Sequence, residues 1–349
     1  MEVLVLGGTA WLGRAVARHA LGLGHAVTCL ACGESGAPAP GARLVVADRG
    51  AVAPGDGPDP YAALPRQEWD LVIELTWQPG FAVQALRALS DQAHRWVYVS
   101  SGSVYADHGV IGGGQELPLL DALDTPRASR EEYGAAKVAC EQAVRAVRGP
   151  DALIARSGLI AGYGDPSDRF GYWVGRCALA VQDGGPLLVP ERTGRPAQLV
   201  DVLDLSAWLV DAALCGCIGT VDAYGPRHTL EDVIAQAEQV TGFGGPRVPV
   251  GDAVLRERGI EEFMGKRSLA LWMAHEQWQG FSAHDDSSAV GAGLVARPLE
   301  ETTRAALVWE RELGLSRTDR AAGLDRDDEL RLIALTSPGA VGDDLSGRR

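Results

Sequence analysis

The sequence predicts an α/β fold, with a doubly wound parallel sheet followed by a smaller C-terminal domain. Short apolar runs of strand length alternate with helix-like segments through the first half of the chain, a pattern typical of parallel sheets. A glycine-rich turn, residues 7–13, stands between the first apolar run and the first helix-like segment. Ligands of such folds bind at the carboxyl ends of the strands, so the residues that follow each run are the first candidates for a site.

The individual elements follow from the same patterns. Strands are predicted at 3–6, 26–30, 43–47, 71–75, 96–100 and 153–156, and helices at 14–21 and 133–147. Beyond residue 160 the pattern is less regular, and 244–300 is predicted to be mostly irregular. The elements expected there are a helix over 168–180, a strand over 198–202 that returns to the main sheet, a helix from a capping box at Thr229 to about 241, and a helix over 302–313.

Composition and charge argue against several classes of protein. The chain has 349 residues, of which 46% are hydrophobic and 22% charged, as in a globular protein. A net charge of −14 and a pI of about 5.0 disfavour nucleic acid and anionic membranes as partners. No apolar run of about 18 residues is present and the N-terminus enters a strand directly, so we expect no membrane span and no signal peptide. A cytoplasmic protein is predicted.

The cysteines are predicted to be ordinary reduced thiols. They include the close pairs Cys29 with Cys32 and Cys215 with Cys217, but no histidine cluster stands near either pair in the sequence. Disulfides are rare in the cytosol, so neither pair indicates a redox centre. No metal site is expected.

One lysine stands at helical spacing from a tyrosine. Only two of the 32 basic side chains are lysines, Lys137 and Lys266. Lys137 comes four residues after Tyr133 in the predicted helix 133–147, so the phenol and the ammonium share a face. An ammonium can aim three donors at different partners, which the planar guanidinium of arginine cannot do. In a chain that uses arginine almost everywhere, this lysine indicates an acid–base pair with Tyr133.

The turn at 7–13 has the residues of a phosphate-binding site. Glycines at 7, 8 and 13 let the backbone come close to a ligand, and the following helix offers N–H groups and the positive end of its dipole. The same strand–turn–helix arrangement can also serve packing alone, so this motif by itself leaves both interpretations open.

Three motifs in this order resemble the extended short-chain dehydrogenase/reductase family, which includes nucleotide-sugar epimerases and dehydratases. They are the turn 7–13, the run Val99-Ser100-Ser101-Gly102-Ser103-Val104-Tyr105, and Tyr133-Gly134-Ala135-Ala136-Lys137 followed by Glu141. The resemblance covers residues 2–313. Residues 165–173 and 296–299 are similar to an epimerase-like bacterial subgroup related to the chloroplast stem-loop-binding proteins.

The resemblance implies a Rossmann-type fold and a catalytic set of Ser101, Tyr133 and Lys137. Tyr133 is implied to be the general acid or base on a hydroxyl or carbonyl group. Lys137 is implied to favour the ionised phenol by its charge and to hold the nicotinamide ribose. Ser101 is implied to hydrogen-bond the reacting oxygen, although a serine at this position can also simply cap a strand end.

Cofactor and substrate contacts follow from the same resemblance. The residues implied to bind the nicotinamide dinucleotide are Gly7, Thr9, Ala10, Trp11, Leu12, Gly13, Cys32, Asp48, Arg49, Leu75, Thr76, Tyr133 and Lys137. The residues implied to bind substrate are Trp77, Ser103, Tyr105, Arg169, Trp173 and Arg297, with Glu74, His108 and Tyr163 as further pocket candidates. His108 is either a second acid–base group or a solvated loop histidine, and Trp173 is either a pocket or a core residue.

Two departures from the family pattern affect the cofactor and the substrate. Where the subgroup often has an arginine for the 2′-phosphate of NADP, this chain has Cys32, so NAD is slightly favoured over NADP. Where sugar-nucleotide epimerases offer an arginine to the diphosphate, the chain has Ala197 and Gln198, and Arg195 is two residues out of register. The second departure weakens the prediction of a nucleotide-sugar substrate.

The sequence thus predicts an NAD(P)-dependent oxidoreductase or epimerase that acts at a secondary alcohol or ketone of a small polar or sugar-like substrate. Residues 1–162, with 197–225 returning to them, are the predicted cofactor domain, and 163–196 with 226–313 the substrate domain. Residues 314–349 are an extension whose end, after Pro338, is predicted to be disordered. A homodimer is expected. The alternative is a nucleotide-binding regulatory or RNA-binding relative without turnover.

Overall fold

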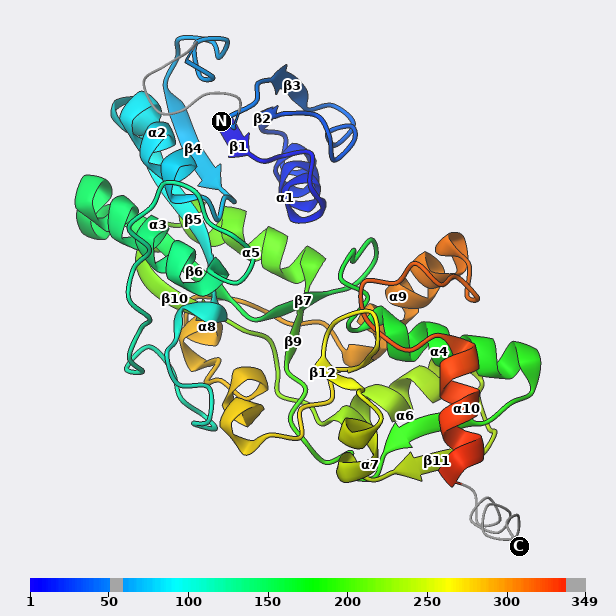
Figure 1. Cartoon of the computed structure of the whole chain (residues 1–349). Coiled ribbons are helices and arrows are strands. Elements are labelled where there is room, and N and C mark those ends of the chain that lie inside the picture. The colour runs from blue at the N-terminus through cyan, green and yellow to red at the C-terminus, as the bar shows by residue number, and fades with distance from the viewer. Residues whose placement is uncertain (51–58, 337–349) are drawn as a thin grey trace, which may run out of the picture. The chain divides into compact units, whose positions relative to one another are not determined.

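The computed structural model describes residues 1–50 and 59–336, so the tail after Pro338 lies outside the described residues. Its chain forms two compact units (Figure 1). Unit 1 comprises 1–160, 198–226 and 280–296, and unit 2 comprises 161–197, 227–279 and the chain from 297 onward. Residues 280–296, which the sequence analysis grouped with the second domain, lie in unit 1.

Unit 1 is built on a seven-stranded parallel sheet, which confirms the predicted α/β class. Its strands run in the order β10-β6-β5-β4-β1-β2-β3. The order reverses at β1, whose neighbours are β2 and β4, as expected of a doubly wound sheet. The strands are β1 (Glu2–Leu6), β2 (Ala26–Ala31), β3 (Arg43–Val46), β4 (Trp69–Glu74), β5 (Ala93–Ser101), β6 (Ala152–Ser157) and β10 (Gly219–Ala223).

The predicted return of 198–202 to the main sheet is wrong. Strand β9 (Leu199–Asp201) instead pairs with β7 (Leu159–Ala161) in a separate two-stranded sheet. The edge position of the main sheet belongs to β10, which pairs with β6. Its sequence Gly-Thr-Val-Asp-Ala has only two residues that favour a strand, of which Val221 alone is strongly apolar, and for that reason the apolar pattern did not reveal it.

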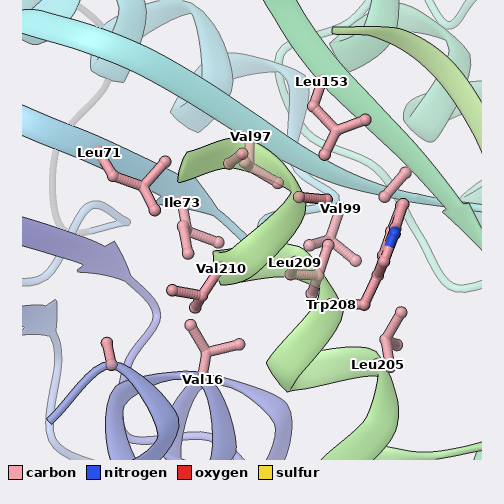
Figure 2. Close-up of a cluster of buried hydrophobic side chains, with 14 of the residues drawn as sticks. Val16, Leu71, Ile73, Val97, Val99, Leu153, Leu205, Trp208, Leu209 and Val210 are labelled. Carbon is pink, nitrogen blue, oxygen red and sulfur yellow. The ribbon is translucent and has the colours of Figure 1, made fainter. Parts of the chain in front are cut away.

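Both faces of the sheet are covered by helices. On one face, α1 (Trp11–Gly22) and α5 (Val202–Leu214) pack in a cluster that includes Val3 and Val5. Figure 2 shows Val16 of α1 and Leu209 of α5 in this cluster. Leu4 and Leu6 join the other cluster, whose helices are α2 (Pro79–Leu89) and α3 (Tyr133–Arg148). Alternate residues of β1 thus enter opposite cores, which explains why these strands read as unbroken apolar runs.

Short elements complete unit 1. They are the 3₁₀ turns η1 (Ser90–Gln92), η2 (Gly102–Val104) and η3 (Gly149–Asp151), and the helix α8 (Ser287–Gly291). A further 3₁₀ segment, η4 (Glu276–Ser282), leads into residues 280–296.

Unit 2 contains helices and two small sheets. Its elements are α4 (Gly171–Asp183), β8 (Leu187–Pro190), α6 (Leu230–Thr241), β11 (Arg247–Val250), α7 (Asp252–Glu257), β12 (Glu261–Phe263), β13 (Ser268–Ala270), α9 (Leu299–Leu313) and α10 (Arg326–Thr336). β8 pairs with β11, and β12 with β13. The predicted capping box is confirmed, because Thr229 and Asp232 exchange side-chain to main-chain hydrogen bonds at the start of α6. Helix α4 begins three residues later than predicted.

Within the described residues, no helix is both long enough and apolar enough to span a bilayer.

Candidate functional site

The glycine turn between β1 and α1 is tightly packed. Gly7 has a φ of +96°, which residues with a Cβ rarely adopt. A Cβ at Gly8 would overlap the side chain of Cys29 in β2, and one at Gly13 would overlap the main chain of Gly7 and Gly8. The glycines therefore let the start of α1 lie directly against the turn, the arrangement that brings a helix N-terminus to a dinucleotide pyrophosphate.

The N-terminus of α1 has no side-chain cap. Ala10 is the N-cap residue, in an extended conformation, and its methyl group cannot accept from the first helical N–H groups. Those groups can be satisfied by an anion at the helix N-terminus. The neighbouring Thr9 is buried, while Trp11 and Leu12 are partly buried. This donor set fits the phosphates of a dinucleotide.

Lys137 is buried and its ammonium is held by main-chain oxygens. It is 3% exposed, and Nζ donates to Thr76 O at 2.8 Å and to Val99 O at 2.6 Å. The two carbonyls come from the segments at the carboxyl ends of β4 and β5. Nζ also lies 5.8 Å from the ring centre of Tyr133, one turn earlier on α3. The ammonium is therefore fixed beside the phenol, as the helical spacing predicted.

Tyr133 begins α3 close to the turn that follows β5. A Cβ at Gly134 would overlap the carbonyl of Ser103 in η2, so only glycine lets the helix start pack here. Ser101 ends β5, accepts from Ser103 N at 3.2 Å, and donates to Ser103 Oγ at 3.2 Å. The ring of Trp77 lies 5.7 Å from that of Tyr133. The structure thus gathers Ser101, Ser103, Trp77 and Tyr133 at one edge of the sheet.

A buried ion pair supports the segment that carries Thr76. Arg49 Nη1 donates to Glu74 at 2.8 and 3.0 Å, and the side chain of Glu74 is completely buried. Glu74 Oε1 also accepts from Thr76 N at 2.9 Å. Glu74 is therefore occupied in holding this segment and is unsuited to contact substrate. Leu75, between them, is partly buried.

The adenosine side of the predicted site lies after β2 and β3. Cys32, after β2, is exposed, and Asp48, after β3, accepts from Gly50 N at 2.6 Å. The guanidinium of Arg49 is committed to Glu74 and also lies 5.2 Å from the ring centre of Phe81. Among the described residues, Arg14 of α1 approaches the loop after β2, because a Cβ at Gly36 would lie 3.8 Å from its Nη1.

A second buried ion pair lies beside the predicted catalytic residues. Glu141, one turn after Lys137 on α3, accepts from Arg156 at 2.9 and 2.8 Å and from Ser100 Oγ at 2.6 Å. Both charged side chains are at most 4% exposed. The pair ties α3 to β5 and β6 next to Ser101. Sequence reasoning noted Glu141 but missed Arg156, for which the one available signal was a charge inside the apolar run 153–156.

Tyr105 continues this network away from the sheet edge. Its hydroxyl donates to Asp222 at 2.6 and 2.7 Å and accepts from Arg156 Nη1 at 3.0 Å. Burial raises the pKa of Asp222 to about 6. His284 stacks between Tyr105 and Tyr224, and burial lowers the pKa of its imidazole to about 4. The ring of Tyr105 is fully buried and its hydroxyl is bonded, so this internal role accounts for the residue without a ligand. Its contact with substrate stays a prediction.

The remaining predicted substrate residues, Arg169, Trp173 and Arg297, belong to unit 2. Trp173 is completely buried and its indole N–H donates to Ala270 O at 2.7 Å, so core packing accounts for it without a ligand. Arg169 and Arg297 are partly buried.

His108 of unit 1 lies edge-on to Phe281, and burial lowers the pKa of its imidazole. Tyr163 of unit 2 donates to Glu312.

The residues near the expected diphosphate arginine are engaged elsewhere. Arg195 forms a two-pronged ion pair with Asp252 inside unit 2, with Nη1 at 2.9 Å from Oδ1. Gln198 is buried in unit 1, where it donates to Gly225 O and His284 O and accepts from His284 N. The guanidinium of Arg195 is therefore committed to Asp252, and Gln198 carries no positive charge for a nucleotide-sugar diphosphate.

Two further observations concern metal ligands and a surface hollow. Across residues 1–50 and 59–336, no three His, Cys, Asp or Glu side chains come together as a metal site. A surface hollow of about 400 Å³ is lined by residues that include Arg95, Asp151 and Cys217. It lies toward the amino end of β5, whereas Ser101 and the predicted catalytic residues are at the carboxyl end.

The fold is shared with solved structures of sugar epimerases, although neither a family model nor a curated protein sequence matches the chain. A candidate epimerase from Burkholderia cenocepacia J2315 is similar over 89% of this chain and 98% of its own, at 19% identity and a TM-score of 0.64. The UDP-glucuronic acid 4-epimerase of Bacillus cereus, solved with NAD, is similar over 90% of this chain and 99% of its own, at 16% identity and a TM-score of 0.61. Bordetella bronchiseptica WbmF, solved with NAD+, is similar over 89% of this chain and 92% of its own, at 15% identity and a TM-score of 0.58. The likeness extends over both units.

Proposed function

We propose that the chain is an NAD-dependent enzyme of the extended short-chain dehydrogenase/reductase type, an epimerase or oxidoreductase acting at a secondary alcohol of a sugar-like substrate. The observation that carries the proposal is the buried Lys137 ammonium beside Tyr133, at the same sheet edge as Ser101 and the glycine turn. Support comes from the solved structures with this fold, which include epimerases and of which at least two were determined with NAD.

Each catalytic residue has a role that its surroundings support. The phenolate of Tyr133 takes the proton of a substrate hydroxyl, and the phenol so formed returns a proton to the carbonyl oxygen in the reverse direction, while the Lys137 ammonium stabilises the phenolate by its charge. Ser101 Oγ, oriented by Ser103, hydrogen-bonds the reacting oxygen. NAD, when bound, supplies hydride transfer at the substrate carbon. Thr76 O and Val99 O keep the ammonium in one position throughout.

NAD is the cofactor we propose, and NADP is its competitor. The residue after β2 is the uncharged Cys32, and Arg49 is engaged with Glu74. Cys32 therefore offers no positive charge to the 2′-phosphate of NADP, and the charge of Arg49 is already paired. Arg14, near Gly36, is the group that supports NADP instead. Comparing the dissociation constants of NAD and NADP decides between them.

The substrate we propose is a sugar-like compound without a nucleotide diphosphate. Gln198, which stands where a diphosphate-binding arginine is expected, is buried and hydrogen-bonded inside unit 1, and the nearby Arg195 is paired with Asp252. A regulatory or RNA-binding role without turnover is less well supported, because the net charge is −14 and the similar structures include sugar epimerases. We further expect a cytoplasmic location and a homodimer. Light scattering on the purified protein measures its molar mass and so tests the homodimer.

The experiment that tests the function combines cofactor binding with turnover. NAD and NADP are titrated at up to millimolar concentration while the melting temperature is followed, since binding to the folded state alone stabilises it. The protein is then assayed at 340 nm, with NAD or NADH, against neutral sugars, uronic acids, sugar phosphates and UDP-sugars. Products are also analysed for epimers. Bound NAD in the purified protein favours an epimerase, because epimerases retain their cofactor. No shift with either cofactor, in protein shown to carry no bound nicotinamide after purification, rejects the proposal.

A further inference from the structure

The segment 75–78, between β4 and α2, lies outside helix and strand, yet it carries one of the two acceptors of the Lys137 ammonium. The acceptor is the carbonyl oxygen of Thr76, which also accepts from Tyr98 OH at 3.1 Å. Main chain outside helices and strands is not fixed by their regular hydrogen bonds, and Thr76 is buried away from water. The position of this carbonyl therefore depends on the side chains that hold the segment.

The amide of Thr76 is held by Glu74, the last residue of β4. Glu74 Oε1 accepts from Thr76 N at 2.9 Å and from Arg49 Nη1 at 3.0 Å, and Oε2 accepts from the same Nη1 at 2.8 Å. The carboxylate is completely buried and the guanidinium nearly so. In the sheet, β1 and β2 lie between β4 and β3, the strand that precedes Arg49. One carboxylate thus binds an arginine from a non-adjacent segment and fixes Thr76 by its amide.

Stability alone does not account for this buried pair. Removing two charges from water costs about as much as their attraction returns, and apolar side chains of similar volume are often as stabilising. The second buried pair, Glu141 with Arg156, adjoins the other acceptor of the ammonium, Val99 O. Glu141 accepts from the hydroxyl of Ser100, the residue after Val99, at 2.6 Å. Each carbonyl that holds the ammonium is therefore next to a segment fixed by a buried glutamate.

The two carbonyls determine the direction of the ammonium. An ammonium has three donors, of which Thr76 O and Val99 O take two, and two fixed acceptors decide where the third donor points. Nζ lies 5.8 Å from the ring centre of Tyr133. If Thr76 O were displaced, the flexible stem of Lys137 would let the ammonium turn about its bond to Val99 O. Its charge and its third donor would then lose their fixed place beside the phenol.

We propose that Glu74 is a positioning residue: by holding the amide of Thr76, it fixes the carbonyl that receives the Lys137 ammonium, and so sets NAD affinity and turnover without touching either ligand. The inference rests on the proposed function, because Lys137 is expected there to stabilise the phenolate and to hold the nicotinamide ribose. Arg49 neutralises the buried carboxylate that makes the contact. Every residue of this arrangement belongs to unit 1.

The test compares Glu74→Gln with Glu74→Met, both in full-length protein that also carries Arg49→Met. The two side chains are similar in size, but the Gln carbonyl can accept from Thr76 N, whereas a thioether is a weak acceptor. Arg49→Met is present throughout, because a lone buried guanidinium would destabilise the fold. Any contact of Arg49 with NAD then cancels from the comparison. Both proteins are also made with Lys137→Met, which completes a double-mutant cycle.

NAD dissociation constants are measured by titration calorimetry on protein freed of bound nicotinamide, or NADP constants where the unsubstituted protein prefers NADP. With Lys137 present, the Glu74→Met protein is expected to bind about fivefold or more weakly than the Glu74→Gln protein. Its kcat is expected to be about tenfold lower on any compound that the unsubstituted protein turns over. With Lys137→Met, the two dissociation constants are expected to agree within about twofold.

The matched control is another buried pair whose glutamate holds a main-chain amide. In unit 2, Arg176 pairs with Glu329, which accepts from Leu188 N at 2.9 Å. Glu329→Gln and Glu329→Met, each with Arg176→Met, are expected to differ in melting temperature and to share one NAD dissociation constant. Glu74→Leu and Lys137→Gln replace a corresponding variant that fails to unfold cooperatively on heating.

Equal NAD affinities in the Glu74→Gln and Glu74→Met proteins overturn this inference alone. The same difference between them after Lys137→Met also overturns it, because Glu74 would then act by another route. Unsubstituted protein that binds neither NAD nor NADP overturns it together with the proposed function.

Discussion

The ammonium of Lys137 donates to the main-chain carbonyl of Thr76, 2.8 Å away, across the gap between α3 and the end of β4. The same carbonyl accepts from Tyr98 OH at 3.1 Å, and the amide of Thr76 donates to Glu74. Both main-chain polar groups of Thr76, its N–H and its carbonyl oxygen, are therefore hydrogen-bonded. The position of the ammonium follows from the main chain, which explains why a compact cation is found at 137.

Lys137→Arg is predicted to lower turnover by about 10² or more and to weaken NAD binding. A guanidinium is larger and planar, so it cannot occupy the buried space between Thr76 O and Val99 O with the same donor directions. Steady-state kinetics and NAD titration measure both effects. The matched control is Lys266→Arg, because Lys266 is exposed and is the other lysine of the chain. Near-normal turnover in Lys137→Arg rejects the requirement for an ammonium.

Cys32→Arg is predicted to raise the affinity for NADP about tenfold or more while NAD affinity changes little. The substitution places a cation after β2, where the 2′-phosphate of NADP is expected, and charge-assisted contacts to phosphate are strong. Titration calorimetry of both cofactors measures the change. Cys215→Arg, at another exposed cysteine of unit 1, controls for added charge alone. If unsubstituted protein already prefers NADP, Arg14→Gln identifies whether Arg14 holds the phosphate.

Asp222 and His284 are predicted to give opposite pH dependences of stability. Burial raises the pKa of Asp222 from 3.8 to about 6, so the folded state binds the proton that the unfolded chain releases, and this contribution to stability falls as pH rises from about 4 to 6. Burial lowers the pKa of His284 from 6.5 to about 4, so its contribution is lost as pH falls from 6.5 toward 4. In the unsubstituted protein the two effects oppose each other.

Substituting either residue exposes the effect of the other. Urea unfolding of Asp222→Asn is expected to show a steeper loss of stability than the unsubstituted protein between pH 6.5 and 4.5. His284→Phe, which keeps a flat ring between Tyr105 and Tyr224, is expected to lose stability less steeply over the same range. His94→Gln is the control, since His94 is 56% exposed. Parallel profiles for all four proteins contradict the burial argument.

The sequence predicted the features that depend on neighbours in the chain. Apolar runs located six strands of the main sheet, and the spacing of Tyr133 and Lys137 placed both on one face of α3. The features it missed depend on contacts between distant segments. Arg156 and Asp222 join one network only because β6 and β10 are adjacent, and Asp168 forms an ion pair with Arg317, which is 149 residues away in the sequence. No local pattern marks such pairs.

The catalytic assignment is tested most directly by turnover in Tyr133→Phe, measured at 340 nm beside NAD titration of the same protein. The substitution removes the transferable proton and keeps the ring that lies against Trp77. The account predicts unchanged NAD affinity and a loss of about 10²–10⁴ in kcat for Tyr133→Phe. Turnover within about threefold of the unsubstituted protein contradicts it.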